Sequence, residues 1–219
     1  MARLLFEKTG NAVWISHLDL MRLFQRAFKR AGLPLTHTQG YNPRPSVSIA
    51  LPLSVGIESS CELLDFDLDD DVSVPYEEIK KRLNDALVAG IRVLDAFENG
   101  RKIRDLALLS CQVVLEYDAG VPVGCVDAIR QLFESNELVV PKKSKNGPTE
   151  QDIVPLIKEL SVTADGNNVV LDAVICCQNP SLSPVQLIAA VEKYLPEMNP
   201  DFAKCRRIEL FDAQRNTFR

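Results

Sequence analysis

The chain has 219 residues, of which 46% are hydrophobic and 25% are charged, and its net charge at pH 7 is −5. This composition is typical of a globular protein long enough for two small domains, and the acidic balance argues against non-specific binding of nucleic acid. No apolar run approaches the roughly 18 residues of a membrane helix, and Arg3, Glu7 and Lys8 interrupt any signal-peptide core, so we expect a cytoplasmic protein without membrane contact.

The first half predicts a β-α-β-β-α-β order of elements. Strands are expected at residues 3–8, 35–38, 46–51, 62–68 and 91–97, helices at 16–31 and 76–88, and a short return limb carrying Trp14 at 12–15. Ser16 and Asp19 form a capping box at the start of the first helix. Its buried stripe repeats at helical spacing, and Gly32 followed by Pro34 ends it.

The second half predicts the same order again. Strands are expected at 109–117, 138–141, 168–177 and 207–211, with helices at 124–134 and 183–194. Lys142, Lys143 and Lys145 lie in a polar stretch that favours a flexible connection. We therefore expect an α+β fold of two tandem ferredoxin-like (split βαβ) halves with antiparallel sheets, covering residues 1–100 and 101–219.

The segment 38–59 is the most informative part of the sequence. Gly40 permits unusual backbone angles, and two prolines fix φ on either side of Arg44. A loop of this kind presents Tyr41, Asn42 and Arg44 in one geometry, which suits binding. Tyr41 is a candidate for stacking on a nucleic-acid base. Trp14 is a second candidate, although packing in its hairpin is the favoured interpretation for that ring.

The first helix carries Arg22, Arg26, Lys29 and Arg30 at spacings that align them along one edge. One interpretation is a ridge that follows phosphates, strengthened if the Arg44 loop lies beside it. The alternative is a solvated face, on which only the last two cations gain from the helix dipole. The sequence leaves both interpretations open.

His17 is the main candidate for a catalytic role. It follows the helix cap, where it suits a general base or a ligand contact, and Lys8 and Tyr41 complete a conceivable group for metal-independent RNA cleavage. No carboxylate partner is evident, so the sequence favours a protein that is not an enzyme.

No metal site and no cofactor are expected. The six cysteines match no ligand spacing. A run of aspartates between residues 65 and 71 favours a solvated strand edge that blocks unwanted pairing over a site for a divalent ion.

Several motifs together carry a family resemblance, namely 6–10 (FEKTG), 16–22 (SHLDLMR), 39–45 (QGYNPRP), 50–53 (ALPL), 55–59 (VGIES) and 152–157 (DIVPLI). The chain resembles the bacterial "radical SAM-linked" family, an uncharacterised domain found alone or fused behind radical SAM proteins. It departs from the family pattern at four positions: Tyr41 replaces a usual phenylalanine, Arg44 a common histidine, Ser46 a frequent lysine and Val154 an arginine.

The resemblance implies a radical SAM partner and a genomic setting near an RNA-processing ribonuclease and ribosomal proteins. We hypothesise a non-catalytic RNA-recognition or substrate-presenting accessory protein for a radical SAM enzyme that modifies tRNA or rRNA. The substrate contacts would come from His17, Arg22, Tyr41, Asn42 and Arg44, with Arg26 and Lys29 steering phosphates.

Two alternatives stay open. One is a metal-independent endoribonuclease of the CRISPR RNA-processing type, in which His17 is the general base and Arg44 stabilises the phosphorane. The other is a module that docks on the radical SAM protein without touching RNA. The sequence identifies neither the RNA nor the oligomeric state.

Overall fold

The computed structural model describes residues 2–39, 41–98, 101–144 and 147–219. The chain divides into two compact units, one formed by Met1–Asp105 with Phe218–Arg219 and the other by Leu106–Thr217. The sequence places the division after residue 100. Residues 99 and 100 of the expected connection lie outside the described residues, as does Gly40 of the loop.

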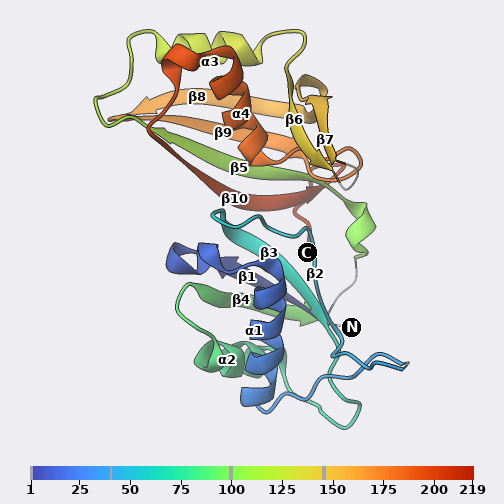
Figure 1. Cartoon of the computed structure of the whole chain (residues 1–219). Coiled ribbons are helices and arrows are strands. Elements are labelled where there is room, and N and C mark those ends of the chain that lie inside the picture. The colour runs from blue at the N-terminus through green and yellow to red at the C-terminus, as the bar shows by residue number, and fades with distance from the viewer. Residues whose placement is uncertain (1, 40, 99–100, 145–146) are drawn as a thin grey trace. The chain divides into compact units, whose positions relative to one another are not determined.

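The first unit is an antiparallel sheet with two helices. Its elements are β1 (Ala2–Lys8), the 3₁₀ helix η1 (Gly10–Trp14), α1 (His17–Arg30), β2 (Val47–Ile49), β3 (Glu58–Phe66), α2 (Tyr76–Ala86), β4 (Ile91–Glu98) and the 3₁₀ helix η2 (Ile103–Asp105). Within this unit the strands lie in the order β4-β1-β3-β2. The chain leaves α1, runs out into a long loop and returns as β2 (Figure 1).

The core of this unit lies between the sheet and its helices. Alternate residues of β1 and β3 point toward α1, because successive side chains of a strand face opposite sides. Phe6 of β1 meets Phe24 of α1 with ring centroids 4.8 Å apart, and Phe28 meets Phe66 of β3 at 5.0 Å. These four rings are almost fully buried, so the predicted apolar stripe of the first helix is confirmed at its central positions.

An ion pair is buried on the other side of β1. The Arg3 side chain is fully buried and donates from Nε and Nη2 to the two carboxylate oxygens of Asp65, at 2.6 and 3.0 Å. Nη2 also donates to the Arg101 carbonyl oxygen at 3.1 Å, and the guanidinium carbon lies 5.5 Å from the centre of the Phe218 ring. The solvated edge expected for the aspartates is therefore only partly present at Asp65, whose carboxylate pairs with Arg3 and is 13% exposed.

The second unit has the same arrangement of main strands and helices, with an additional hairpin. Its elements are β5 (Leu106–Glu116), α3 (Cys125–Phe133), β6 (Val139–Ser144), β7 (Gly147–Asp152), the 3₁₀ helix η3 (Val154–Leu156), β8 (Ile157–Asp165), β9 (Asn168–Cys176), α4 (Pro184–Tyr194), the 3₁₀ helix η4 (Pro196–Met198) and β10 (Phe202–Asp212). Its sheet has the antiparallel order β10-β5-β9-β8.

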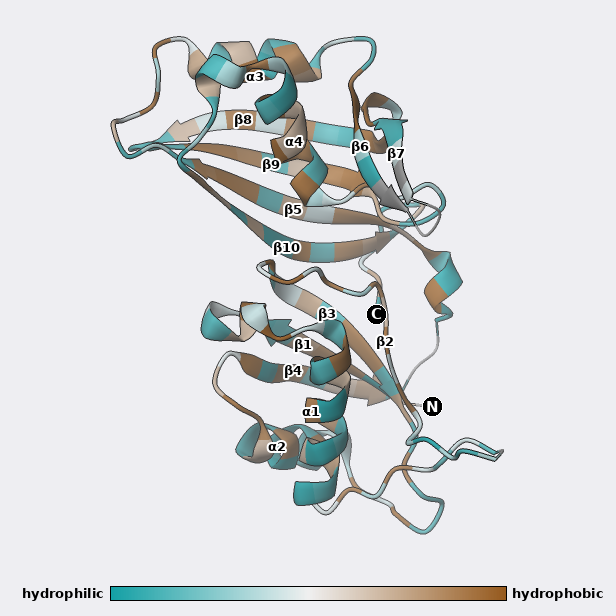
Figure 2. Cartoon of the chain, in the orientation of Figure 1, coloured by the Kyte–Doolittle hydropathy of each residue, from teal (hydrophilic) through white to brown (hydrophobic). Residues whose placement is uncertain are grey.

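The fold is thus mixed α+β, with four α-helices among the described residues and largely antiparallel pairing. The sheet strands are mostly hydrophobic, whereas hydrophilic residues line much of α1 (Figure 2). In the parts of the chain that the structure describes, no helix is long and apolar enough to cross a bilayer.

Two short strands predicted in the first half are absent. Residues 10–14 form η1, in which Ala12 and Val13 are buried and the Ile15 amide donates to the Ala12 carbonyl oxygen at 3.0 Å. Residues 35–38 contribute only isolated bridges, Leu35 with Leu68 and His37 with Pro45. Alternating apolar residues fit either a strand or a short 3₁₀ turn, and tertiary packing decides between them.

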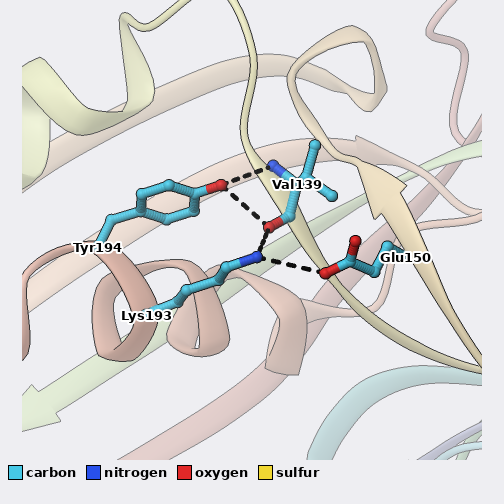
Figure 3. Close-up of polar contacts among 4 residues, drawn as sticks. All are labelled: Val139, Glu150, Lys193 and Tyr194. Carbon is cyan, nitrogen blue, oxygen red and sulfur yellow. Dashed lines mark hydrogen bonds and ion pairs between the residues drawn. The ribbon is translucent and has the colours of Figure 1, made fainter.

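The polar stretch expected as a flexible connection belongs to the hairpin of β6 and β7, with Lys145 outside the described residues. Helix α4 holds this hairpin in place (Figure 3). The Tyr194 hydroxyl accepts from the Val139 amide and donates to the Val139 carbonyl oxygen, both at 3.1 Å. Lys193 donates to the same carbonyl oxygen at 2.8 Å and to the Glu150 carboxylate at 3.4 Å. The prediction of a flexible connection is therefore wrong for the described residues.

Candidate functional site

The predicted cation row lies on the exposed side of α1. Arg22, Arg26 and Lys29 are all exposed, whereas Arg30 turns away and donates to the Ala86 carbonyl oxygen at the end of α2, at 2.6 Å. Three cations separated by about one helical turn therefore share one face. Arg30 caps a neighbouring helix and does not extend the row.

The start of α1 is fixed by the predicted cap. The Asp19 amide donates to the Ser16 hydroxyl oxygen at 3.2 Å, and that hydroxyl donates to the Asp19 carboxylate at 2.7 Å. Arg22 donates to the other carboxylate oxygen at 3.0 Å. The hydrogen bonds from Ser16 and Arg22 hold the pKa of Asp19 below its usual value. Arg22 is therefore an exposed cation whose direction is set by the helix cap.

The loop that carries Tyr41, Asn42 and Arg44 is closed at its base by backbone pairing. The Thr38 amide donates to the Arg44 carbonyl oxygen at 2.8 Å, and the Arg44 amide donates to the Thr38 hydroxyl at 3.1 Å. Beyond these bonds, Tyr41 and its neighbours up to Arg44 are exposed. The loop thus presents an aromatic ring, an amide and a guanidinium to solvent from a paired base.

A groove joins this loop to the C-terminal end of α1. It has a volume of about 430 Å³, and its lining includes Gln25, Lys29, Leu35, His37, Pro45 and Asp69. Lys29 belongs to the cation row, and His37 and Pro45 form the base of the loop. Two features that the sequence places far apart are therefore neighbours.

The predicted site residues do not gather around His17. His17 is half-buried at the first position of α1, and the helix rise of 1.5 Å per residue puts it about 18 Å from Lys29 along the axis. Lys29 is the member of the row that lies beside the loop base. The candidate residues thus form an extended surface, with His17 at one end and the loop at the other.

Trp14 is exposed, and the interpretation that it packs in a hairpin is wrong. Its side chain is 68% exposed, in contrast to the packed ring favoured by the hairpin interpretation. The ring edge lies over Gly56, where an added Cβ would meet the ring carbon Cζ3 at 3.7 Å. Leu18 and Val55 are also exposed. An open indole therefore stands near the start of the cation row.

Lys8 cannot join the catalytic group considered from the sequence. Its side chain is buried, and its ammonium donates to the Ile15 carbonyl oxygen at 2.8 Å. Burial lowers the pKa of Lys8, an effect that the nearby Glu62 carboxylate opposes. Among the described residues, His17 has no hydrogen-bond or ion-pair partner to orient its ring.

The cysteines are buried or half-buried free thiols. Burial raises the pKa of Cys111, Cys177 and Cys205 to about 12, so these three thiols stay protonated near neutral pH. No group of three or more His, Cys, Asp or Glu side chains that could hold a metal occurs in the described part of the chain.

Three solved structures are similar to this chain over most of its length. A structure described as a Cbf5-Nop10-Gar1 complex matches 95% of this chain and 48% of its own chain, with 10% identity and a TM-score of 0.50. A structure of an H/ACA RNP bound to a substrate RNA containing 2′-deoxyuridine matches 94% of this chain and 46% of its own chain, with 8% identity and a TM-score of 0.47. A structure of an unknown protein from Galdieria sulphuraria matches 94% of this chain and 96% of its own chain, with 10% identity and a TM-score of 0.27.

The chain spans less than half the length of the first two of these structures. At such identities the likeness concerns the fold alone. No curated protein matches the sequence. A family model described as "Uncharacterized protein conserved in bacteria (DUF2344)" matches residues 2–184, and the chain belongs to this family.

Proposed function

We propose that this protein is a non-catalytic RNA-recognition or substrate-presenting accessory protein that acts with a radical SAM enzyme modifying tRNA or rRNA. The observation that carries the RNA part is the exposed row of Arg22, Arg26 and Lys29 on α1. Cations in a row attract consecutive phosphates, and exposed aromatic rings offer stacking surfaces for bases.

The arrangement of this surface favours a strand that lies lengthwise along α1. Trp14 and His17 stand near the N-terminal end of the helix. The loop with Tyr41 and Arg44 begins beside Lys29 at the other end. A single strand can meet the aromatic rings and the cations in turn, because its bases are free to unstack.

The interpretation of each unit as a ferredoxin-like half belongs to the same proposal. Both units follow a β-α-β-β-α-β order once the β6–β7 hairpin is treated as an insertion. The strand orders β4-β1-β3-β2 and β10-β5-β9-β8 correspond position by position. This correspondence supports two copies of the split βαβ arrangement.

The endoribonuclease alternative has less support. A general base needs reach to the scissile group and a partner that orients it. His17 lacks such a partner among the described residues, Lys8 is buried, and the loop with Tyr41 and Arg44 begins at the opposite end of α1. The observations favour RNA binding over cleavage.

The RNA part is tested by measuring the affinity for single-stranded RNA at several salt concentrations. A triple variant, Arg22→Gln, Arg26→Gln and Lys29→Gln, removes the row. Each single-strand phosphate contact contributes about 0.7 to the slope of log affinity against log salt, so we expect the triple variant to flatten that slope by about 2. Wild-type binding without salt dependence would contradict the proposal.

A matched control removes the same charge from α2. The substitutions Lys80→Gln, Lys81→Gln and Arg82→Gln also delete three cations, all on one helix of the same unit. We expect this control to keep the wild-type slope. Equal losses in both variants would show that the net charge, and not the row on α1, governs binding.

The partnership is tested by co-purification with a radical SAM modification enzyme, with and without ribonuclease treatment. Capture in both conditions supports direct association. Capture that persists in a protein without RNA affinity would favour the docking alternative. No capture in either condition would contradict the partnership and leave the RNA measurement to stand alone.

A further inference from the structure

The groove at the C-terminal end of α1 has the make-up of a small ligand site. Its volume of about 430 Å³ lies within the range of roughly 300–1,000 Å³ found for ligand pockets. Leu35, Pro34 and Pro45 supply apolar lining. Proline rings and aliphatic side chains offer apolar surface, and a planar ring that packs on it is favoured because apolar area of both partners is removed from water.

The lining of the groove also supplies polar groups of several kinds. Lys29 contributes a cation, Gln25 an amide, His37 an imidazole and Asp69 a carboxylate. Within the described residues, none of these four side chains has a hydrogen-bond or ion-pair partner. The groove therefore combines apolar lining with donors and acceptors that make no hydrogen bond within the described residues.

We propose that this groove receives one unstacked nucleotide of a single-stranded RNA. The inference rests on the proposed RNA function and specifies how the strand is held. The base packs against Leu35 and the two prolines, and its edge meets the Gln25 amide and the Asp69 carboxylate. Lys29 binds the phosphate of the same nucleotide.

Charge and position both favour this occupant. Arg26 lies one helical turn before Lys29, so the cation row leads along α1 to the edge of the groove. A strand whose phosphates follow the row arrives at the groove with a base free to turn inward. In a duplex the bases stay stacked and paired, and such a groove is out of their reach.

The test compares two fluorescent oligomers of equal length by anisotropy. One is an ordinary single-stranded 12-mer RNA, and the other carries the same phosphates but is abasic throughout. Because the abasic strand has no base that could pack on the protein, we expect wild-type protein to bind the ordinary strand at least about tenfold more tightly than the abasic strand.

The variant Gln25→Trp fills the groove without changing any charge. It should weaken binding of the ordinary strand by about tenfold and leave binding of the abasic strand unchanged, while Trp14 and Tyr41 keep their own base contacts. The second comparison is Lys29→Gln, whose loss of affinity should exceed that of the exposed control Lys81→Gln on α2. Retained amide-exchange protection in β1 and β3 confirms that each variant is folded.

The outcomes separate the two proposals. Salt-sensitive RNA binding that Gln25→Trp leaves unchanged, with equal losses in Lys29→Gln and Lys81→Gln, would overturn the groove and leave the RNA function intact. No salt-sensitive binding of either oligomer by wild-type protein would overturn both. A base preference that Gln25→Trp reduces by about tenfold supports the groove.

Discussion

The ion pair of Arg3 and Asp65 gives the sharpest stability prediction. The substitution Arg3→Met keeps much of the side-chain volume but removes two hydrogen bonds to the carboxylate and one to the Arg101 carbonyl oxygen. Breaking a buried pair costs about 3–5 kcal/mol, because the remaining charge is left without compensation. Since the Asp65 side chain is 13% exposed, water solvates it in part. We therefore expect Arg3→Met to lower the opening free energy of β1 and β3 by about 3 kcal/mol, at the low end of that range.

The double variant Arg3→Met, Asp65→Leu separates the lost pairing from the lost packing. Replacing a whole buried pair by apolar groups is often neutral for stability. We therefore expect the double variant to recover most of the opening free energy that Arg3→Met loses. The control is Arg104→Met, since Arg104 and Asp105 form an exposed pair with an N–O distance of 3.8 Å. Exposed pairs contribute at most about 1 kcal/mol.

Amide hydrogen exchange of β1 and β3 measures the effect. A chain with two compact units need not unfold in one step, whereas exchange gives the opening free energy of each strand separately. A loss below about 1 kcal/mol in Arg3→Met, or a double variant less stable than the single one, would refute the reasoning.

Three further predictions concern other parts of the structure. Gly90→Ala should lower the stability of its unit by more than about 2 kcal/mol, because the φ of Gly90 is +86° and an added Cβ would collide with the Thr9 carbonyl oxygen. Gly166→Ala should lower stability by only about 1 kcal/mol, because the φ of Gly166 is +59° but the space around it is open. Amide exchange in each unit compares the two losses. Tyr194→Phe should lower the local opening free energy of β6 and β7 by about 1 kcal/mol and so speed amide exchange there, because two hydrogen bonds to the hairpin are lost. Unchanged exchange would show that these two bonds do not hold the hairpin. Because burial lowers the pKa of Lys8, the unfolded state binds more protons than the folded state between that pKa and 10.5. The contribution of Lys8 to the unfolding free energy therefore rises with pH in this range. Urea titrations at several pH values should show a flatter dependence for Lys8→Met than for wild-type protein, and parallel curves would contradict the prediction.

The elements whose information is local were predicted from the sequence. Helix α1 has a cap, an apolar stripe and a glycine stop within 17 residues, and each of these acts through neighbours in the chain. The β6–β7 hairpin has no such local signal, since most of its residues are polar and each strand contains a proline. Its order depends on Tyr194 and Lys193, which lie more than 40 residues away.

The candidate site divides in the same way. The cation row was predicted because helical spacing alone puts Arg22, Arg26 and Lys29 on one face. The groove was not, because Asp69 and His37 meet the end of α1 only through the path of the chain between helix and strand. The exposure of Trp14 was also missed, since an indole in a short apolar run reads as core.

Phe218 has a consequence for the order in which the protein is made. Its fully buried ring completes the unit that begins at the N-terminus, although more than 100 residues separate it from Asp105. During synthesis the ribosome releases the whole of Leu106–Thr217 before this ring becomes available to Arg3. The unit translated first is therefore finished last, and a fragment ending at residue 105 leaves that guanidinium without its aromatic neighbour.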